Sequence, residues 1–411
     1  MRHTGITIAA PLLALALLAA DAGAQGRIVQ LPRADRALAG APAAVYTIGA
    51  AEGAEEETFG TIAGVGFDAA ENLYVLDQQN ARVMVYGPNG RFLRRIGKKG
   101  QGPGELMIPT QIAVAPDGTV TINDMATQRL NVFRPDGTFV RTLQTPGVTT
   151  GGPLAWHPRG FLGAFRPMMS REGNFSQTST SVPLLLYPAA GGEPAKVFDV
   201  PQTISVQQTS GGPAAAQTTR LRVSGPAAFS PAVLYGVLPT GQVALSFTSG
   251  YTVRVIDTKG QTLRYLQRPL PVRLTTEADR ERARAQRREM FRTGRGMVRI
   301  VTGGGGGAAP PPPSAAELEA RMGEMRFADT IAALRGLRTS PSGKIWVERT
   351  GRLVGEPGPL DLITPEGQYL GTTTAMQLPG AISRGGLAAF ITRDEDDVEQ
   401  VVVKRLPAGW R

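Results

Sequence analysis

Short runs in which apolar and polar residues alternate recur along this chain of 411 residues, and turn residues separate them. The pattern is most regular in residues 112–139, where three such runs and two Pro-Asp-Gly turns follow one another. Alternation with a period of two is typical of β-strands that have one buried face, and Pro-Asp-Gly favours tight turns. The pattern therefore predicts an all-β chain built from successive antiparallel hairpins.

The same pattern occurs 47 residues upstream, in residues 65–92. This offset aligns Asp77 with Asp124, and it aligns Arg82 with Arg129. One unit used twice without a gap indicates a repeat fold. Each copy contains four candidate strands, which is the composition of one blade of a β-propeller.

Four later units follow the same plan more loosely, and their strands are recognised from the turns between them. The predicted strands of the six units are 64–68, 73–77, 83–87 and 92–96; 112–115, 120–124, 129–134 and 139–143; 154–157, 161–165, 182–187 and 196–199; 233–237, 243–247, 251–257 and 262–267; 334–339, 345–348, 360–364 and 369–373; 381–383, 387–392 and 400–406. The last unit lacks a fourth strand, and residues 45–48 form the one spare strand that we expect before the first unit. We predict a six-bladed β-propeller in which this amino-terminal strand completes the last blade and covers its free edge, with five or seven blades as alternatives.

The first two units resemble NHL repeats. The resemblance rests on the AxxPDGxxxxxD pattern at 113–124, the R(L/V)xVF-like run at 129–133 and the GxGPGEL segment at 100–106. The whole chain resembles exported bacterial proteins that are described simply as six-bladed β-propellers. The resemblance implies a fold and an exported location, and it implies no reaction.

Residues 268–333 interrupt the blade pattern. Two capping boxes, which begin at Thr276 and Ser314, predict helices over 277–292 and 315–325. Five consecutive glycines and then four prolines lie between the two helices, and such a segment cannot pack a core. We therefore predict an insertion that is partly helical and partly disordered.

Residues 1–24 have the pattern of an export signal, with Arg2, an apolar stretch over 6–20 and Ala-Gly-Ala before Gln25. The apolar stretch is shorter than the roughly 20 residues that a membrane span needs. We expect cleavage after residue 24, a single propeller domain over 25–411, and a secreted or periplasmic location.

The composition narrows the chemistry that the chain can perform. There is no cysteine, and His157 is the one histidine outside the predicted signal. Disulfides, thiolate chemistry and His/Cys metal clusters are therefore excluded, and a Ser-His-Asp triad has a single candidate base. His157 stands at a predicted strand end before a turn, which favours a solvent-facing or hydrogen-bonded turn residue over a catalytic base.

The repeated pairs Asp77 with Arg82 and Asp124 with Arg129 stand at the turn between the second and third strands. Because the pairs recur at identical spacing, we interpret them as structural: a carboxylate that binds turn amides and faces the arginine of the returning strand. The acidic run over 394–397 lacks the spacing of an EF-hand. We predict no cofactor, with Ca²⁺ held by carboxylates and carbonyls as the alternative.

A four-stranded meander places the connections between strands two and three, and those from strand four to the next blade, on one face of the ring. The long segments all belong to this set: 49–63, 98–109, a hairpin extension over 166–181, a Gln/Ser/Thr-rich connection over 200–224, 268–333 and 349–359. We call this the long-loop face. Loops on a rigid scaffold commonly carry binding residues, so the predicted ligand-binding residues on this face are Lys98, Lys99, Gln101, Arg166, Arg287 and Arg288.

The long loops on one face and the shortage of catalytic residues predict a non-enzymatic binding or scaffolding propeller. Its partner would be a peptide, a protein or an anionic glycan on the long-loop face. The net charge of +10 favours encounter with anionic partners, but solubility is its simpler explanation. Nucleic acid is disfavoured, because the arginine-rich stretch over 273–299 contains one aromatic residue. The alternative is a cation-dependent lyase or lactonase, since propellers related by the resemblance include such enzymes; its candidate residues are Asp68, Asn123 and Asp124.

Overall fold

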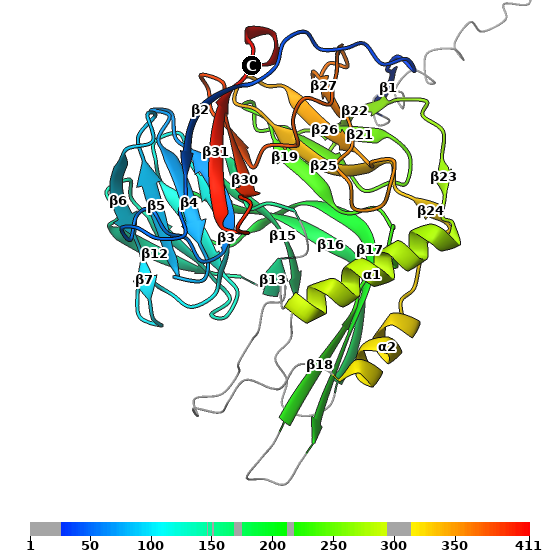
Figure 1. Cartoon of the computed structure of the whole chain (residues 1–411), viewed down its shortest axis with the longest axis horizontal. Helices are drawn as coiled ribbons and strands as arrows, with labels where there is room; N and C mark the ends of the chain where they lie inside the picture. Colours follow the sequence, from blue (N-terminus) through cyan, green and yellow to red (C-terminus); the bar gives the residue numbers. More distant parts are fainter. Residues whose placement is uncertain (1–25, 146, 150–151, 168–174, 212–217, 294–313) are drawn as a thin grey trace, which may run out of the picture.

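Six antiparallel sheets form a ring around a central axis in the computed structural model, which describes residues 26–411 apart from 146, 150–151, 168–174, 212–217 and 294–313 (Figure 1). The chain is an all-β, six-bladed propeller, as predicted. The predicted export signal, and the Gly-rich and Pro-rich segment of the insertion, lie outside the described residues. In the described part of the chain, no helix has the length and apolar character needed to cross a membrane.

Blades one and two are the most regular, and their strands match the predicted ranges closely. Blade one consists of β3 (Ile62–Phe67), β4 (Leu73–Asp77), β5 (Arg82–Tyr86) and β6 (Phe92–Ile96). Blade two consists of β9 (Pro109–Val114), β10 (Val120–Asp124), β11 (Arg129–Phe133) and β12 (Phe139–Gln144). A short parallel pair, β7 (Lys98–Lys99) with β8 (Glu105–Leu106), lies between them in the sequence.

The other four blades keep the same strand order. Blade three consists of β14 (Ala155–His157), β15 (Gly160–Pro167), β16 (Phe175–Pro188) and β17 (Ala195–Gly211), and blade four of β19 (Leu234–Val237), β20 (Val243–Ser246), β21 (Thr252–Ile256) and β22 (Thr262–Gln267). Blade five consists of β25 (Leu334–Thr339), β26 (Ile345–Arg349), β27 (Leu360–Ile363) and β28 (Tyr369–Thr373), and blade six of β29 (Ala381–Ile382), β30 (Leu387–Arg393), β31 (Glu399–Arg405) and β2 (Ala43–Ile48).

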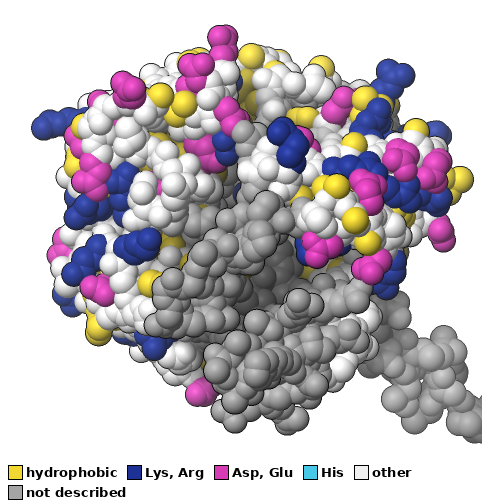
Figure 2. Space-filling view, turned by 60° about the horizontal axis from the view of Figure 1, so that its bottom comes forward, with side chains coloured by type: hydrophobic (Ala, Val, Ile, Leu, Met, Phe, Trp, Pro, Cys, Tyr) yellow, Lys and Arg dark blue, Asp and Glu magenta, His cyan; other side chains and the backbone are white. Residues whose placement is uncertain are grey.

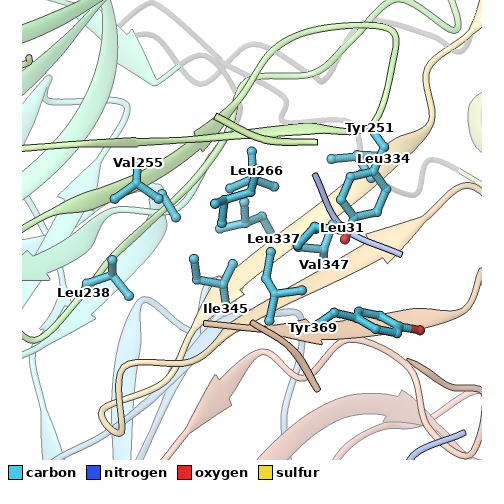
Figure 3. Close-up of a cluster of buried hydrophobic side chains, with 13 residues drawn as sticks. Leu31, Leu238, Tyr251, Val255, Leu266, Leu334, Leu337, Ile345, Val347 and Tyr369 are labelled. Atoms are coloured by element: carbon cyan, nitrogen blue, oxygen red, sulfur yellow. The ribbon is translucent and has the colours of Figure 1, made fainter. Parts of the chain in front are cut away.

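Apolar side chains of neighbouring blades interlock and form the core. Every residue of β4, β5 and β10 is buried, because the middle strands of a blade have another blade against each face. One cluster joins Leu238, Val255 and Leu266 of blade four to Leu337 and Ile345 of blade five (Figure 3). Burial of this apolar surface, at roughly 25 cal/mol per Å², is the main contribution to the stability of the ring.

The ring closes through the amino-terminal strand, as the sequence predicts. β2 pairs with β31 in antiparallel register, with Tyr46 opposite Val403 and Ile48 opposite Val401. Tyr46 also packs in the apolar cluster that joins blade six to blade one. Closure therefore combines a strand ladder between the two ends of the chain with side-chain packing across the joint.

A further amino-terminal strand lies outside the predicted set. β1 (Arg27–Gln30) adds in parallel to the outer edge of β22, although its residues are mostly exposed. The segment after it is anchored by Leu31, which is buried in the cluster between blades four and five. A strand of four residues with little buried surface carries too weak an alternation to be recognised.

Blade three departs from the prediction in one connection. The sequence predicts an irregular connection over 200–224, but β17 continues to Gly211 and pairs with β18 (Thr218–Ser224). β13 (Gly147–Thr149) also pairs with the far end of β15. The Ser/Thr/Gln-rich composition indicates a loop because it lacks apolar alternation, whereas a hairpin that projects beyond the blade needs no buried face.

The insertion after blade four contains both predicted helices, α1 (Glu277–Thr293) and α2 (Ala315–Gly323). Both capping boxes form: the backbone N–H of Asp279 donates to the hydroxyl of Thr276 (3.2 Å), and that of Glu317 donates to Ser314 (3.3 Å). At the base of the insertion, β23 (Arg273–Leu274) pairs with β24 (Thr330–Ile331). The chain ends in a short 3₁₀ helix, η1 (Ala408–Trp410).

The long connections meet on one face of the ring, as the meander requires. Ala228, between blades three and four, donates its N–H to Arg326 O (2.8 Å), and Ala333 donates to Ser249 O (2.8 Å). The side-chain amide of Gln286, on α1, donates to Val354 O of blade five (3.1 Å). The insertion is thus held against neighbouring long loops of blades four and five (Figure 1).

The closing strand generates a stability prediction at Tyr46. Its hydroxyl is buried and has no hydrogen-bond partner among the described residues, and burial raises the pKa of this phenol to about 12. Tyr46→Phe should therefore leave the free energy of unfolding unchanged or raise it slightly, since only an unsatisfied hydroxyl is lost. Tyr46→Ala should lower that free energy by about 2 kcal/mol, because packing at the joint is lost.

Urea denaturation of both variants checks this expectation. Val45→Ala is the matched control, because Val45 is the adjacent residue of β2 and is 41% exposed; its effect should stay within about 0.5 kcal/mol. A loss from Tyr46→Phe as large as that from Tyr46→Ala would contradict the prediction.

Candidate functional site

Two of the three predicted residues in the connection over 98–109 line a polar hollow of about 380 Å³. Lys98 and Lys99 line it together with Arg82, Arg95 and Glu55. The Glu55 carboxylate accepts hydrogen bonds from Arg82 (2.6 Å) and Arg95 (2.7 Å), which hold the pKa of Glu55 below its usual range. The ammonium group of Lys98 lies 3.2 Å from Glu105. Acidic partners within the chain thus already compensate part of this basic hollow.

Gln101 is exposed in the loop between β7 and β8. Its neighbour Gly102 donates its backbone N–H to the Glu105 carboxylate (2.9 Å), and this bond, with Lys98, lowers the pKa of Glu105. Arg166 belongs to β15, where its backbone pairs with Val148 of β13.

Arg287 and Arg288 lie on α1. The Arg288 guanidinium forms two hydrogen bonds with the Glu319 carboxylate of α2, at 2.8 and 3.0 Å, so it ties the two helices together. The Arg287 guanidinium lies 5.2 Å from the ring centre of Phe291, a cation–π contact. In Figure 1, β7 lies at the left edge of the ring and α1 at the lower right, well apart on the long-loop face. The structure therefore does not gather the six predicted residues into one site.

The positive charge of α1 is largely compensated within the insertion. Arg284 pairs with Glu277 and Glu281, and Arg292 pairs with Glu289. Figure 2 shows basic and acidic side chains interleaved on this side of the molecule. Exposed ion pairs of this kind contribute little to stability, but they leave α1 less available to an anionic partner than its arginine count suggests.

A second hollow of about 540 Å³ lies at the base of the insertion, on the long-loop face, and we call it the base groove. Its apolar lining includes Leu270, Val272 and Ile331, and Val272 is 63% exposed. The next apolar residue along β23, Leu274, is 69% exposed. Two large apolar side chains are thus exposed to water at the groove or next to it, which makes this surface a candidate interaction site.

Three arginines surround the base groove. Arg273 forms an ion pair with Asp279, and Arg349 forms one with Asp35 (2.8 Å). Arg352 is exposed and has no ion pair among the described residues. The sequence does not indicate this groove. β23 pairs with β24, which lies more than fifty residues away, and no local sequence pattern predicts such a contact.

The repeated Asp and Arg residues adopt different arrangements in blades one and two. Asp77 is fully buried, accepts from the N–H groups of Gly60 and Asn80, and pairs with Arg82 Nε (3.1 Å). The corresponding Asp124 is also fully buried and accepts four backbone N–H groups, those of Met107, Ile108, Ala126 and Thr127.

Arg129 pairs with Asp124 in strand register, but its buried Nε has no hydrogen-bond partner among the described residues. Both carboxylates therefore organise turns, and in blade one the arginine is part of that arrangement.

His157 joins two turns of neighbouring blades. It is 2% exposed, its Nδ1 accepts the backbone N–H of Arg159 (3.0 Å), and its Nε2 lies 3.0 Å from Gly241 O. The geometry assigns the ring proton to Nε2, which donates to that carbonyl. Burial lowers the pKa of His157, so the neutral ring is favoured and the residue has a structural role.

The candidates for a cation-dependent enzyme do not form one site. Asp68 lies at the end of the innermost strand of blade one, where its carboxylate accepts from Asn72 and Tyr74. Asn123 and Asp124 end the second strand of blade two, so they lie toward the opposite face of the ring. Among the described residues, no group of three or more His, Cys, Asp or Glu side chains could hold a metal ion.

Comparisons with known proteins agree with the architecture. A protein-family model described as a 6-bladed beta-propeller matches residues 52–150. Protein brain tumor of Drosophila melanogaster is 27% identical over 110 residues, an alignment that covers 26% of this chain and 10% of that protein. The chain therefore spans about a tenth of the length of this curated relative.

Several solved structures are similar across most of the chain. They include a Bacteroides fragilis protein described as exported (10% identity, 92% of this chain and 99% of that one, TM-score 0.48), virginiamycin B lyase from Staphylococcus aureus (11%, 83% and 80%, 0.39), and the RRP9 WD40 repeats (11%, 89% and 99%, 0.42). At these identities and TM-scores the neighbours say nothing about the ligand or activity of this chain.

The two blade arrangements generate a prediction for the arginines. Arg82→Met should lower the free energy of unfolding by about 3 kcal/mol, because it leaves the buried Asp77 carboxylate without its charged partner. Arg129→Met is the matched control and should cost less than about 1 kcal/mol, since Asp124 is satisfied by backbone N–H groups. Urea denaturation measures both, and equal losses would contradict this account.

His157 generates a prediction for the dependence of stability on pH. Its pKa is lowered in the folded state, so between that lowered value and the ordinary 6.5 the unfolded chain binds a proton that the folded chain does not. Stability should therefore fall as the pH falls below 6.5. His157→Gln should lose less stability between pH 7.5 and 5.5 than the original chain, as measured by urea denaturation, and parallel pH profiles would contradict the assignment.

Proposed function

We propose that this chain is a non-enzymatic binding propeller that holds an acidic peptide or protein segment in the base groove of the long-loop face. The observation that carries the proposal is that one hollow combines the exposed apolar side chain of Val272 with Arg352, which has no ion pair among the described residues. An apolar residue of the partner would enter beside Val272, and a neighbouring carboxylate would meet Arg352.

The surroundings of the base groove support a peptide as occupant. The ladder between β23 and β24 holds one side of the groove, and the ring itself holds Arg349. Arg273 donates to Gly351 O (3.1 Å), which links the insertion to the loop of blade five. A groove whose walls are already fixed binds without a large loss of conformational entropy.

The overall charge also favours an acidic partner. The net charge is +10, and such an excess speeds the encounter of oppositely charged molecules. We further propose that the mature domain, residues 25–411, acts in the periplasm or outside the cell after removal of residues 1–24. Scaffolding by a rigid ring requires no reacting group, in keeping with the single His157 and its structural hydrogen bonds.

Selection of displayed random peptides on the purified chain tests the proposal. The enriched peptides should carry Asp or Glu next to a large apolar residue. Arg352→Ser and Val272→Ser should each weaken binding of an enriched peptide by about tenfold, which corresponds to about 1.4 kcal/mol. Calorimetry on the synthetic peptide measures the affinities.

Arg287→Ser is the matched control, because Arg287 is an exposed arginine of α1 that does not line the groove. It should leave the affinity unchanged. Peptides that bind the Val272→Ser and Arg352→Ser variants as tightly as the original chain would contradict the proposal. The proposal would also be contradicted if the chain bound a sulfated glycan but no peptide, and if Val272→Ser did not weaken that binding.

A further inference from the structure

The centre of the ring contains a cavity of about 320 Å³ to which all six blades contribute. Its walls are the last residues of the innermost strands, such as Phe67 of β3 and Val237 of β19, and the turns after them. These turns are the short ones, so the cavity lies at the face opposite the base groove. The two sites are therefore separate, and a ligand in the central cavity would be independent of the proposed function.

The wall of the central cavity is mostly apolar. Phe67, Val114 and Trp156 are only partly buried, and each lines the cavity. The Pro-x-Gly turns that define the repeats also contribute Pro116, Pro239 and Pro341 to the rim. A volume near 300 Å³ whose wall combines apolar side chains with polar and charged groups is within the range of small-molecule sites.

One partly buried charge faces this apolar wall. Arg338, the fifth residue of β25, lines the cavity, and its guanidinium donates to Gly380 O (3.3 Å) and Leu337 O (3.2 Å). It has no carboxylate ion pair within the described residues. Burial lowers the pKa of Arg338, and the charges of Tyr235 and Glu348 offset this effect only in part. A buried charge is costly unless a partner of opposite charge meets it.

The acid in the lining does not supply that partner. Asp68 already accepts hydrogen bonds from the Asn72 backbone (2.9 Å), the Asn72 side chain (2.7 Å) and the Tyr74 hydroxyl (3.1 Å). A second arginine, Arg384, is exposed at the rim and adds positive charge. The cavity therefore disfavours cations, and no carboxylate of the described residues lies within ion-pair distance of the Arg338 guanidinium.

We infer that the central cavity binds a small organic carboxylate with an apolar body. The carboxylate pairs with the Arg338 guanidinium, which offers several N–H donors in one plane, and the apolar body packs against Phe67 and Trp156. A neutral molecule of the same shape could not form this charge-assisted pair with Arg338 and would bind more weakly.

Calorimetry with 4-phenylbutyrate and its neutral analogue 4-phenylbutyramide tests this inference on the whole chain. The carboxylate should bind at least about tenfold more tightly than the amide, the difference expected for one charge-assisted pair. Arg338→Met should remove this preference. Arg91→Met is the control, because Arg91 is an exposed arginine that does not line the cavity; it should keep the preference.

Fluorescence locates the probe. Of the three tryptophans, Trp346 and Trp410 are buried in the core between blades five and six, whereas Trp156 lines the cavity. Binding should change the emission of the original chain and not that of Trp156→Phe, while calorimetry still detects binding to that variant. Equal affinities for acid and amide, no binding of either, or an unchanged preference in Arg338→Met would overturn the inference.

Discussion

The whole architecture depends on the pairing of β2 with β31, which joins the two ends of the chain in blade six. Without it, the last blade would have three strands and an exposed edge, and the apolar faces of blades six and one would lose part of their cover. No disulfide can replace this contact, because the chain has no cysteine. Further contacts reinforce the joint: the indole N–H of Trp410 donates to Ala39 O (2.9 Å), near the start of β2.

The amino-terminal segment extends this closure around half of the ring. After β1 leaves blade four, the segment passes blade five, where Arg36 donates to Tyr369 O (2.9 Å), before β2 reaches blade six (Figure 1). Arg268 anchors the amino-terminal segment: its guanidinium donates to Pro32 O (2.7 Å) and forms an ion pair with the buried Asp361 (2.8 Å). Closure fixes the orientation of the blades, and the meander within each blade places the long loops on one face.

The contacts that stabilise each strand explain which parts of the fold could be predicted from the sequence. Strand positions in blades one and two follow from short apolar runs between Pro-x-Gly turns. The outer strand β6 alternates in burial, whereas every residue of the middle strands β4 and β10 is buried. The pairing of residues 45–48 with the last blade could be predicted because that blade lacks a fourth strand and these residues form the one spare strand. β1 could not be recognised, because its stability comes from an edge ladder and from Leu31 beyond the strand.

The candidate sites were less predictable, for a different physical reason. Charge density along the chain drew attention to Arg287 and Arg288, yet the carboxylate of Glu319 on α2 compensates Arg288. Arg352 and Arg338 belong to no motif in the sequence. They are candidate binding residues only because each lines a hollow that residues distant in the sequence complete. A binding site in a propeller is assembled from several blades, so its composition is visible only after the ring is closed.

The central claim, that β2 is an integral part of the closed ring, is tested most directly by native-state hydrogen exchange followed by mass spectrometry. The account predicts that amides of residues 43–48 and 399–405 exchange at the slow rate set by unfolding of the whole ring, together with the buried strands of blade one. Rapid exchange of residues 43–48 while blades one to five remain protected would contradict it.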